Sequence, residues 1–413
     1  MRTKRKDAKT QRRKNFYKIL QPLFAPLRLC VFALIPFEIC AMTIEEKVGQ
    51  LLMVQFNGEE INEDAITLLQ KAHVGGFIYY TWANGLHNPV QVQNLSNSLQ
   101  ALAKKYTKIP LFIAIDQEGG TVTRLQEGFT VFPGNNILGM TKNPALAELC
   151  AYAMGKEMHA VGINLNLAPV IDVGSSRSYS NSPEKVVEFG ERALKGYKRA
   201  GIIAALKHFP GQGDVTTDPH VDLPILHKSR EEMNRTELFP FMKLANQSEM
   251  IMTAHLLTPS LDMQNCATLS KKILQTCLRK EIGFNAIIIS DSMVMDAVLK
   301  NTSSVTESTI QAFEAGCDIL LLGGKLLVGS RAGFELTVND VLSIHEALVT
   351  AIKSGRISEE RLDSSVNKIL KVKTNYSLFD WNFPTENEIN LQVKTPEHHH
   401  LSETVKNKEP KSL

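Results

Sequence analysis

Residues 206–224 read Leu-Lys-His-Phe-Pro-Gly-Gln-Gly-Asp-Val-Thr-Thr-Asp-Pro-His-Val-Asp-Leu-Pro. The apolar run Ile202–Leu206 stops at the pair Lys207-His208, and a glycine-rich loop with three carboxylates and a second histidine follows. A buried strand that ends in a cation and an imidazole, followed by a polar loop, is typical of the site-bearing rim of a parallel β/α protein. The stretch therefore predicts a strand end that carries chemistry.

Seven further apolar runs are similar to Ile202–Leu206. Each is short, rich in Ile, Leu or Val, and lacks strict alternation, as expected for strands covered on both faces. They are Gln50–Gln55, Gly76–Tyr80, Leu111–Ile115, Leu165–Val170, Met250–Ala254, Ala286–Ser290 and Asp318–Leu322. Helix-like segments such as Pro183–Ala200 and Ser229–Asn246 separate the runs. Eight alternations predict an α/β fold, a single (β/α)8 TIM-like barrel. The alternative, an open doubly wound sheet, lacks its Gly-x-Gly-x-x-Gly turn here.

Polar residues follow five successive predicted strands. In chain order they are Asp116 with Arg124, Asp172 with Arg177, Lys207 with His208, His255, and Asp291. A single aspartate after a strand is commonly a helix N-cap, and a single histidine is commonly a hydrogen-bonded core residue. Five successive strand ends in one barrel favour a shared site, because all of them meet at one face.

The N-terminal residues 1–42 differ from the rest of the chain. Residues 1–18 contain nine Lys or Arg and one Asp, although the whole chain carries a net charge of only +3. The remainder is therefore acidic, and a nucleic-acid partner is not favoured. The apolar stretch Leu29–Phe37 is too short to span a bilayer, and after a basic head it indicates an export signal with cleavage near Ala41. We expect a periplasmic or secreted protein with no stable membrane span after leader removal; a cytoplasmic protein with a basic extension is the alternative.

The barrel is predicted to occupy residues 43–381, followed by a disordered tail. Residues 382–413 show no apolar periodicity and are rich in Glu, Lys, Asn and Pro. The run His398–His400 is interpreted as a solvated tract, and the six cysteines have no zinc-site spacing. We expect no metal, no cofactor and no essential disulfide, although a Cys266–Cys277 pair stays open. The sequence does not indicate an oligomeric state.

Six strings in this order resemble glycoside hydrolase family 3, in its bacterial β-N-acetylglucosaminidase branch. They are Ala114-Ile-Asp-Gln-Glu-Gly-Gly120, Leu167-Ala-Pro-Val-Ile-Asp-Val173, Lys207-His-Phe-Pro-Gly211, Asp218-Pro-His220, Met252-Thr-Ala-His255 and Ile289-Ser-Asp291. The resemblance covers roughly residues 43–380. It implies a (β/α)8 barrel, which agrees with the independent count of strands.

The resemblance also implies residue roles. It places the nucleophile of a retaining glycosidase on Asp291 and the acid/base on the loop dyad Asp218 and His220. An imidazole titrates near neutral pH, and a hydrogen-bonded aspartate can orient it and stabilise its cation. Sugar-binding roles fall on five further residues, namely Asp116, Arg124, Arg177, Lys207 and His208. Asp172 and His255 are interpreted as residues that position others.

The implied activity is exo-acting removal of terminal GlcNAc from peptidoglycan-derived or chitin-type oligosaccharides. Three alternatives stay open: a GlcNAc phosphorylase, a β-glucosidase of the same family, and a catalytically silent sugar-binding protein. The family's β-glucosidases commonly take the acid/base from an additional C-terminal domain, which we do not expect here. The sequence departs from the branch at Gln212, Pro219 and Thr121, and Pro219 is expected to stiffen the dyad.

Overall fold

The computed structural model describes residues 41–213, 215, 222–299, 302–326 and 331–408. The chain divides into two units, Met1–Met42 and Thr43–Leu413, and every strand that the structure describes lies in the second. They are β1 (Leu52–Val54), β2 (Gly76–Tyr79), β3 (Phe112–Ile115), β4 (Leu165–Asn166), β5 (Ile203–Phe209), β6 (Met250–Thr253), β7 (Ile287–Ile289) and β8 (Leu320–Leu321).

The eight strands form one parallel sheet in the order β7-β6-β5-β4-β3-β2-β1-β8. An additional parallel bridge joins Ile289 to Ile319, and the amide of Ser290 donates to the carbonyl of Ile319 at 3.0 Å. These contacts connect the two ends of the sheet, so the strands enclose a barrel. The predicted (β/α)8 fold is confirmed, and all eight predicted strands are present.

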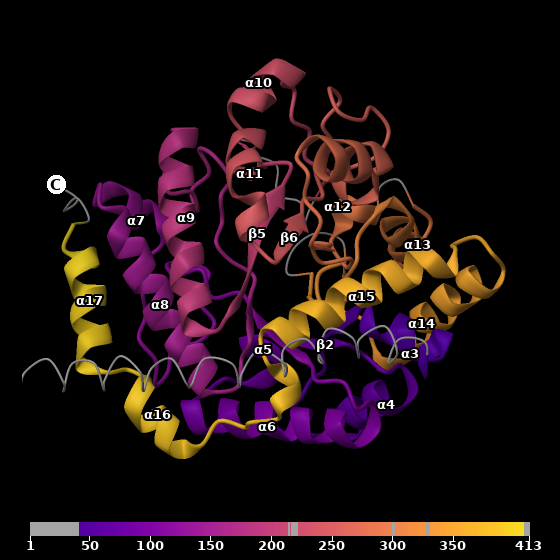
Figure 1. The fold of residues 1–413 in the computed structure, drawn as a ribbon, viewed down its shortest axis with the longest axis horizontal. Coiled ribbons are helices and arrows are strands. Elements are labelled where there is room, and N and C mark those ends of the chain that lie inside the picture. The colour runs from indigo at the N-terminus through magenta and orange to yellow at the C-terminus, as the bar shows by residue number, and fades with distance from the viewer. Residues whose placement is uncertain (1–40, 214, 216–221, 300–301, 327–330, 409–413) are drawn as a thin grey trace, which may run out of the picture. The chain divides into compact units, whose positions relative to one another are not determined.

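Helices lie around the strands (Figure 1). They are α3 (Ile44–Gln50), α4 (Glu63–Lys71), α5 (Thr81–Asn84), α6 (Pro89–Tyr106), α7 (Asn135–Met140), α8 (Pro144–Ala160), α9 (Pro183–Ala200), α10 (Arg230–Arg235), α11 (Leu238–Leu244), η3 (Lys272–Glu281), α12 (Asp296–Leu299), α13 (Val305–Ala315), α14 (Val338–Lys353), α15 (Glu359–Asn375), α16 (Glu386–Gln392) and α17 (Pro396–Lys406). Three short 3-10 segments are η1 (Ala245–Gln247), η2 (Ala267–Leu269) and η4 (Leu378–Asp380).

Local sequence explains where these helices begin and end. The predicted helix Pro183–Ala200 has those bounds in the structure; the Ser182 side chain caps its N-terminus, and Gly201 ends it in the left-handed conformation. The predicted helix Ser229–Asn246 is instead divided into α10 and α11 at Thr236, whose backbone leaves the helical region. The strands β1, β2, β3, β5, β6 and β7 are buried along their full length, as the apolar runs predicted for all of these except the end of β5.

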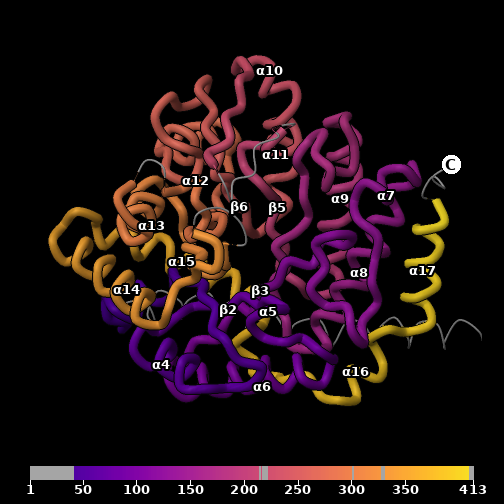
Figure 2. Tube along the Cα trace, turned by 180° about the vertical axis from the view of Figure 1, so that it is seen from behind, coloured from indigo at the N-terminus to yellow at the C-terminus, as the bar shows by residue number. Residues whose placement is uncertain are grey.

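The prediction of a disordered tail is wrong for residues 386–406, which form α16 and α17. Both helices pack against α8, and Figure 2 shows α17 beside α7 and α8. The buried carboxylate of Glu157 holds this segment: its Oε1 accepts from the Lys394 amide at 3.0 Å and pairs with His398 Nδ1 at 2.8 Å. The tail folds because a distant helix supplies its partner, which composition does not reveal.

No helix in the described part of the chain is long and apolar enough to cross a membrane. The four cysteines there, Cys150, Cys266, Cys277 and Cys317, are buried free thiols, so the open Cys266–Cys277 pair is not formed in this structure. Burial raises the pKa of Cys266 to about 12, which makes this thiol a poor nucleophile.

Candidate active site

A cavity of about 410 Å³ lies at the C-terminal ends of the strands, and we call it the Asp291 cavity. Six of the predicted site residues line it together, namely Asp116, Arg124, Arg177, Lys207, His208 and Asp291. The sequence placed these residues at separate strand ends, and the barrel brings them to one space. Asp218 and His220 lie outside the described residues.

Lys207 forms the centre of a buried ion cluster in this cavity. Its ammonium Nζ lies 2.8 Å from Asp116 Oδ1 and 2.6 Å from Glu118 Oε1, and only 2% of its side chain is exposed. Arg177 forms a two-pronged pair with Glu118, with Nε 2.9 Å from Oε2 and Nη2 bonded to Oε1. Arg124 approaches the outer oxygen of Asp116 at 3.9 Å. Three cations thus surround two carboxylates.

The electrostatics of the cluster keep Asp116, Glu118 and Lys207 charged. Burial alone would raise the pKa of Asp116 and Glu118, but Lys207 and Arg177 outweigh burial and lower both, with Arg124 also acting on Asp116. Burial alone would lower the pKa of Lys207, and the two carboxylates raise it instead. Fixed charges in a dry site are oriented before a ligand arrives, so they need no reorganisation during a reaction.

The sequence placed Lys207 and His208 after a strand that ended at Leu206, whereas both lie within β5. The strand continues to Phe209, and all seven of its residues are buried. A lysine and a histidine can extend a buried strand here because carboxylates in the segments after β3 and β4 pair with them. This compensation is non-local, and the apolar run alone could not show it.

His208 is oriented by Asp172. Its Nδ1 lies 2.7 Å from Asp172 Oδ2, and Oδ1 of the same carboxylate accepts from the amides of His208 at 3.2 Å and Gln212 at 2.9 Å. Burial would raise the pKa of Asp172, but His208 and these hydrogen bonds lower it. A carboxylate on Nδ1 fixes that nitrogen as a donor and directs Nε2 to other partners. Asp172 thus contacts His208 and does not itself line the cavity.

The backbone around Asp291 is held by buried hydroxyl and imidazole groups. The amide of Asp291 donates to Thr253 Oγ1 at 3.4 Å, and Thr253 bonds to Thr268 at 2.8 Å. His255 Nε2 donates to the carbonyl of Ser292 at 2.8 Å, while its Nδ1 bonds to Thr268 at 2.8 Å. His255 is therefore a positioning residue for the segment that carries Asp291.

The start of the loop after β5 is anchored. Gly211 has φ of +109°, and a Cβ there would lie 2.6 Å from the Cβ of Glu237. Glu237 is buried and pairs with Lys228 at 2.6 Å. Glycine is needed at Gly211 for its backbone angle and for this close approach, so the loop begins from a fixed position.

Several residues that line the Asp291 cavity have no role that the sequence alone predicted. Glu118 lies within one of the family strings, and its position two residues after Asp116 was the available signal. Tyr80 and Trp82 lie outside those strings: their rings stack at 5.2 Å, and Lys325 Nζ lies 5.4 Å from the centre of the Trp82 ring. Trp82 is 43% exposed at this rim.

The described residues include no group of three or more His, Cys, Asp or Glu side chains that could hold a metal ion. The chemistry that the cavity can supply from these side chains is nucleophilic attack by a carboxylate and recognition of hydroxyl groups by fixed charges.

Comparison with known proteins identifies the family to which these residues belong. The model of the glycosyl hydrolase family 3 N terminal domain matches residues 43–372. The chain belongs to glycosyl hydrolase family 3. The family predicted from the sequence is thereby confirmed.

Proteins similar to this chain include two named beta-hexosaminidase and one solved β-N-acetylglucosaminidase. Beta-hexosaminidase A of Pseudoalteromonas piscicida is 33% identical over 375 residues, which is 81% of this chain and 61% of that protein. Beta-hexosaminidase of Pseudomonas aeruginosa is 34% identical over 70% of this chain and 85% of its own length. A solved structure, a family 3 beta-N-acetylglucosaminidase from Paenibacillus sp., has a TM-score of 0.81 and 38% identity, and the match covers 89% of this chain and 69% of that one.

Proposed function

We propose that this protein is an exo-acting, retaining β-N-acetylglucosaminidase. The observation that carries the proposal is the shared cavity of Asp291 and the Lys207 ion cluster at the catalytic end of a family 3 barrel. The relatives named beta-hexosaminidase support an amino-sugar substrate. The proposed substrates are terminal GlcNAc residues of peptidoglycan-derived or chitin-type oligosaccharides.

The proposed reaction has two steps. In the first, a carboxylate oxygen of Asp291 attacks the anomeric carbon, the glycosidic bond breaks, and the His220 imidazolium gives its proton to the leaving oxygen. In the second, water attacks the same carbon, His220 takes the water proton, and Asp291 is released. The roles of Asp218 and His220 rest on the resemblance, since both lie outside the described residues.

Sugar recognition follows from the charges in the cavity. The outer carboxylate oxygen of Asp116 lies 3.9 Å from Arg124, and we expect this oxygen to accept hydrogen bonds from hydroxyls at the non-reducing end. Arg124, Arg177, Lys207 and His208 would surround the remaining hydroxyls and the acetamido group. A preformed set of donors and acceptors favours one orientation of the sugar and brings its anomeric carbon to the nucleophile.

The function is tested by product release from the para-nitrophenyl β-N-acetylglucosaminide and β-glucoside, with and without phosphate. We expect hydrolysis of the GlcNAc substrate by the full chain and loss of it in Asp291→Ala and His220→Ala. External azide should restore turnover in His220→Ala as a glycosyl azide, because azide needs no general base. A fluorinated GlcNAc analogue that slows the second step should leave a covalent adduct on the Asp291 peptide.

Each alternative gives a different result in the same assay. If the sugar is released only when phosphate is present, and as a sugar 1-phosphate, the enzyme is a phosphorylase and not a hydrolase. Faster hydrolysis of the glucoside than of the GlcNAc substrate would identify a β-glucosidase instead of a β-N-acetylglucosaminidase. A folded protein that binds chitobiose without releasing sugar would be a binding protein, and the proposal would be wrong.

We also propose that residues 1–42 export the protein from the cytoplasm. The support is the basic head followed by a short apolar stretch. Fractionation of cells that express the full chain, with mass spectrometry of the mature N-terminus, tests it. A protein retained in the cytoplasm with an intact Met1 would contradict the proposal.

A further inference from the structure

A second cavity, of about 320 Å³, lies at the opposite end of the barrel, and we call it the Trp381 cavity. Its inner wall comes from residues 162–164 and Gly201, which precede β4 and β5. Its outer wall is the segment Tyr376–Pro384, which crosses beneath the barrel after α15. The family match ends at residue 372, so this wall lies beyond the matched region.

The outer wall is held in place by contacts to its neighbours. Asn97 Nδ2 donates to the Pro384 carbonyl at 2.9 Å, and Gln93 Nε2 donates to the Thr385 carbonyl at 2.9 Å. Two non-glycine residues, Ser377 and Trp381, adopt positive φ values of 55° and 52° on either side of η4. Such conformations persist only where surrounding contacts maintain them, so the cavity is preformed.

The lining combines aromatic rings with neutral polar groups. Trp381, Phe383 and Tyr376 supply the rings, and Phe383 is 37% exposed. Burial lowers the pKa of His159, so this imidazole is neutral at pH 7 and can both donate and accept. Ring surface together with a few converging polar groups is the usual composition of a small-molecule site.

The hydroxyl of Tyr376 lies near one described acceptor, the carboxylate of Glu249. It is buried, and no described group meets it with the distance and angles of a hydrogen bond. Burial and the carboxylate of Glu249 raise its pKa, so the hydroxyl keeps its proton. A hydroxyl that keeps its proton can donate to Glu249 or to a ligand oxygen in the cavity.

Charge narrows the class of ligand. Among the described residues that line the cavity, Asp380 and Glu388 are acidic, and none is a lysine or arginine. One cation is near, because Lys104 Nζ lies 5.6 Å from the centre of the Trp381 ring, but the two acidic residues outnumber it, so phosphates, nucleotides and other anions are disfavoured. A pyranoside is uncharged, has an apolar face that stacks on an aromatic ring, and carries hydroxyls at its edge for amide, imidazole and carboxylate groups.

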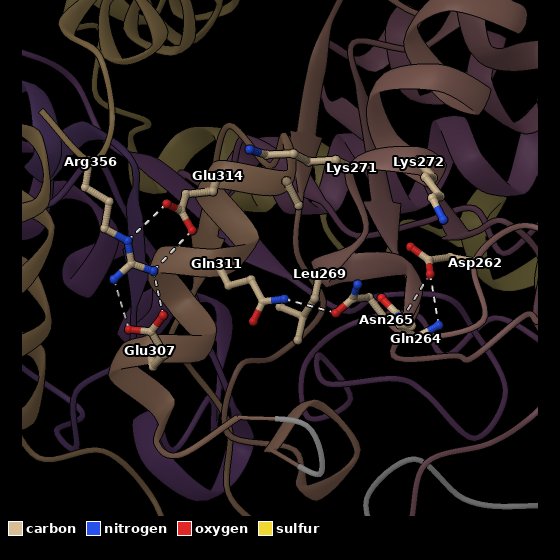
Figure 3. A pocket seen from close by; sticks show the side chains of 11 residues that line it. Asp262, Gln264, Asn265, Leu269, Lys271, Lys272, Glu307, Gln311, Glu314 and Arg356 are labelled. Carbon is tan, nitrogen blue, oxygen red and sulfur yellow. Dashed lines mark hydrogen bonds and ion pairs between the residues drawn. The ribbon is translucent and has the colours of Figure 1, made fainter.

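A third cavity, between η2, η3 and α13, lacks the features of a carbohydrate site and serves as a contrast to the Trp381 cavity (Figure 3). Its polar side chains pair with one another: Arg356 with Glu307 and Glu314, and Gln311 with Asn265 at 3.1 Å. Its described lining contains no aromatic ring. Because its main charged groups are already paired and no ring is present, it lacks the features that mark the Trp381 cavity.

We propose that the Trp381 cavity is a second carbohydrate site, which binds an uncharged pyranoside oligosaccharide away from the catalytic end. Trp381 stacks on one sugar ring, and the Tyr376 hydroxyl donates to a sugar oxygen. The choice of a GlcNAc disaccharide as its ligand rests on the proposed function, whereas the existence of the site does not.

The composition of the chain permits a direct test. It has two tryptophans, Trp82 in the Asp291 cavity and Trp381 in the Trp381 cavity. In the full chain carrying Asp291→Asn, which prevents turnover, adding Trp82→Phe leaves only Trp381 as an emitter. Adding Trp381→Phe instead leaves only Trp82. Each variant then reports one cavity when chitobiose is titrated to about 10 mM; Trp82→Tyr replaces Trp82→Phe if the latter does not fold.

We expect a saturable change in Trp381 emission, with a dissociation constant that differs from the one Trp82 reports. Tyr376→Phe should weaken the Trp381 response and leave the Trp82 response in place. A Trp82 response without a Trp381 response would overturn the second site and leave the proposed function intact. A Trp381 response in a chain that hydrolyses no GlcNAc substrate would support the second site and contradict the proposed function. A linear, unsaturated Trp381 response would also overturn the site.

Discussion

At the C-terminal ends of the strands, the described lining of the Asp291 cavity contains three carboxylates and four cations, whereas at the N-terminal ends the Trp381 cavity contains aromatic rings and mainly neutral polar groups. The first is built from strand ends, whose charges neutralise one another across β3 and β5. The second is completed by one segment that crosses after α15. A site that performs chemistry needs charges fixed by rigid elements, while a site that only binds can be completed by a connecting segment.

The largest expected effect is at the catalytic end. Asp291→Asn should lower kcat by about 10⁴-fold or more, because the amide cannot form the covalent intermediate. The measurement is steady-state hydrolysis of the para-nitrophenyl GlcNAc substrate. Asp296→Asn is the matched control, since Asp296 follows the same strand, does not line the cavity and pairs with Arg331 at 3.0 Å. Loss of activity in the control but not in Asp291→Asn would assign the nucleophile elsewhere.

The next effect concerns the ion cluster. Glu118→Gln removes the partner that Lys207 and Arg177 share, so we expect the free energy of unfolding to fall by about 2–4 kcal/mol. KM should rise on the order of tenfold, because both cations lose their orientation. Denaturant unfolding and steady-state kinetics measure the two effects.

Acid provides a second check on Glu118. Its pKa is lowered in the folded protein, so its contribution to stability is present above the unfolded pKa and lost as pH falls through the folded one. The difference in stability between the wild type and Glu118→Gln should therefore shrink in acid. Exposed Glu127→Gln, in the same segment, should change neither stability nor KM. A difference that grows in acid would mean that Glu118 is protonated in the native state.

Another effect distinguishes the opposite end, where the buried Lys373 bonds to neutral oxygens. Its Nζ bonds to Gln50 Oε1 at 2.9 Å and to the Gly75 carbonyl at 3.0 Å, and burial lowers its pKa to about 7. The folded state then binds fewer protons than the unfolded state between this pKa and about 10.5. Relative to Lys373→Met, the wild type should gain stability by up to about 1.4 kcal/mol per pH unit over this window.

Unfolding at several pH values between 7 and 10 measures this slope. Lys371→Met is the matched control, because Lys371 is exposed two residues away. A wild type whose stability follows that of Lys373→Met at every pH would show that Lys373 keeps its charge in the folded protein.

The smallest effect concerns the Trp381 cavity itself. Tyr376→Phe should weaken chitobiose binding there by about 3- to 10-fold, the range expected for one hydrogen bond. Trp381 emission in the Asp291→Asn and Trp82→Phe background measures it. Tyr106→Phe, a tyrosine that does not line the cavity, should bind as before. Equal weakening in both variants would show that the hydroxyl of Tyr376 makes no specific contact.

The sequence predicted the barrel because a strand that is buried on both faces needs apolar residues at successive positions, and each such run can be recognised locally. It predicted six lining residues because strand ends converge in any barrel. It did not predict that Lys207 lies inside β5, or that Glu118 holds Arg177, because both depend on partners far along the chain. Helices α16 and α17 were missed for the same reason: Glu157 and α8 supply their contacts. The roles of Asp218 and His220 stay predictions.

The segment Tyr376–Pro384 is also synthesised late, after the strands of the barrel. A ribosome makes the chain from its N-terminus, so all eight strands, the last ending at Leu321, are synthesised before this segment. A nascent chain can bring together every described lining residue of the Asp291 cavity while the floor beneath β4 and β5 is still open. Sugar binding at that floor would therefore require a chain synthesised beyond Pro384. Turnover at the Asp291 cavity would not depend on this segment in the same way, because its described lining residues precede it.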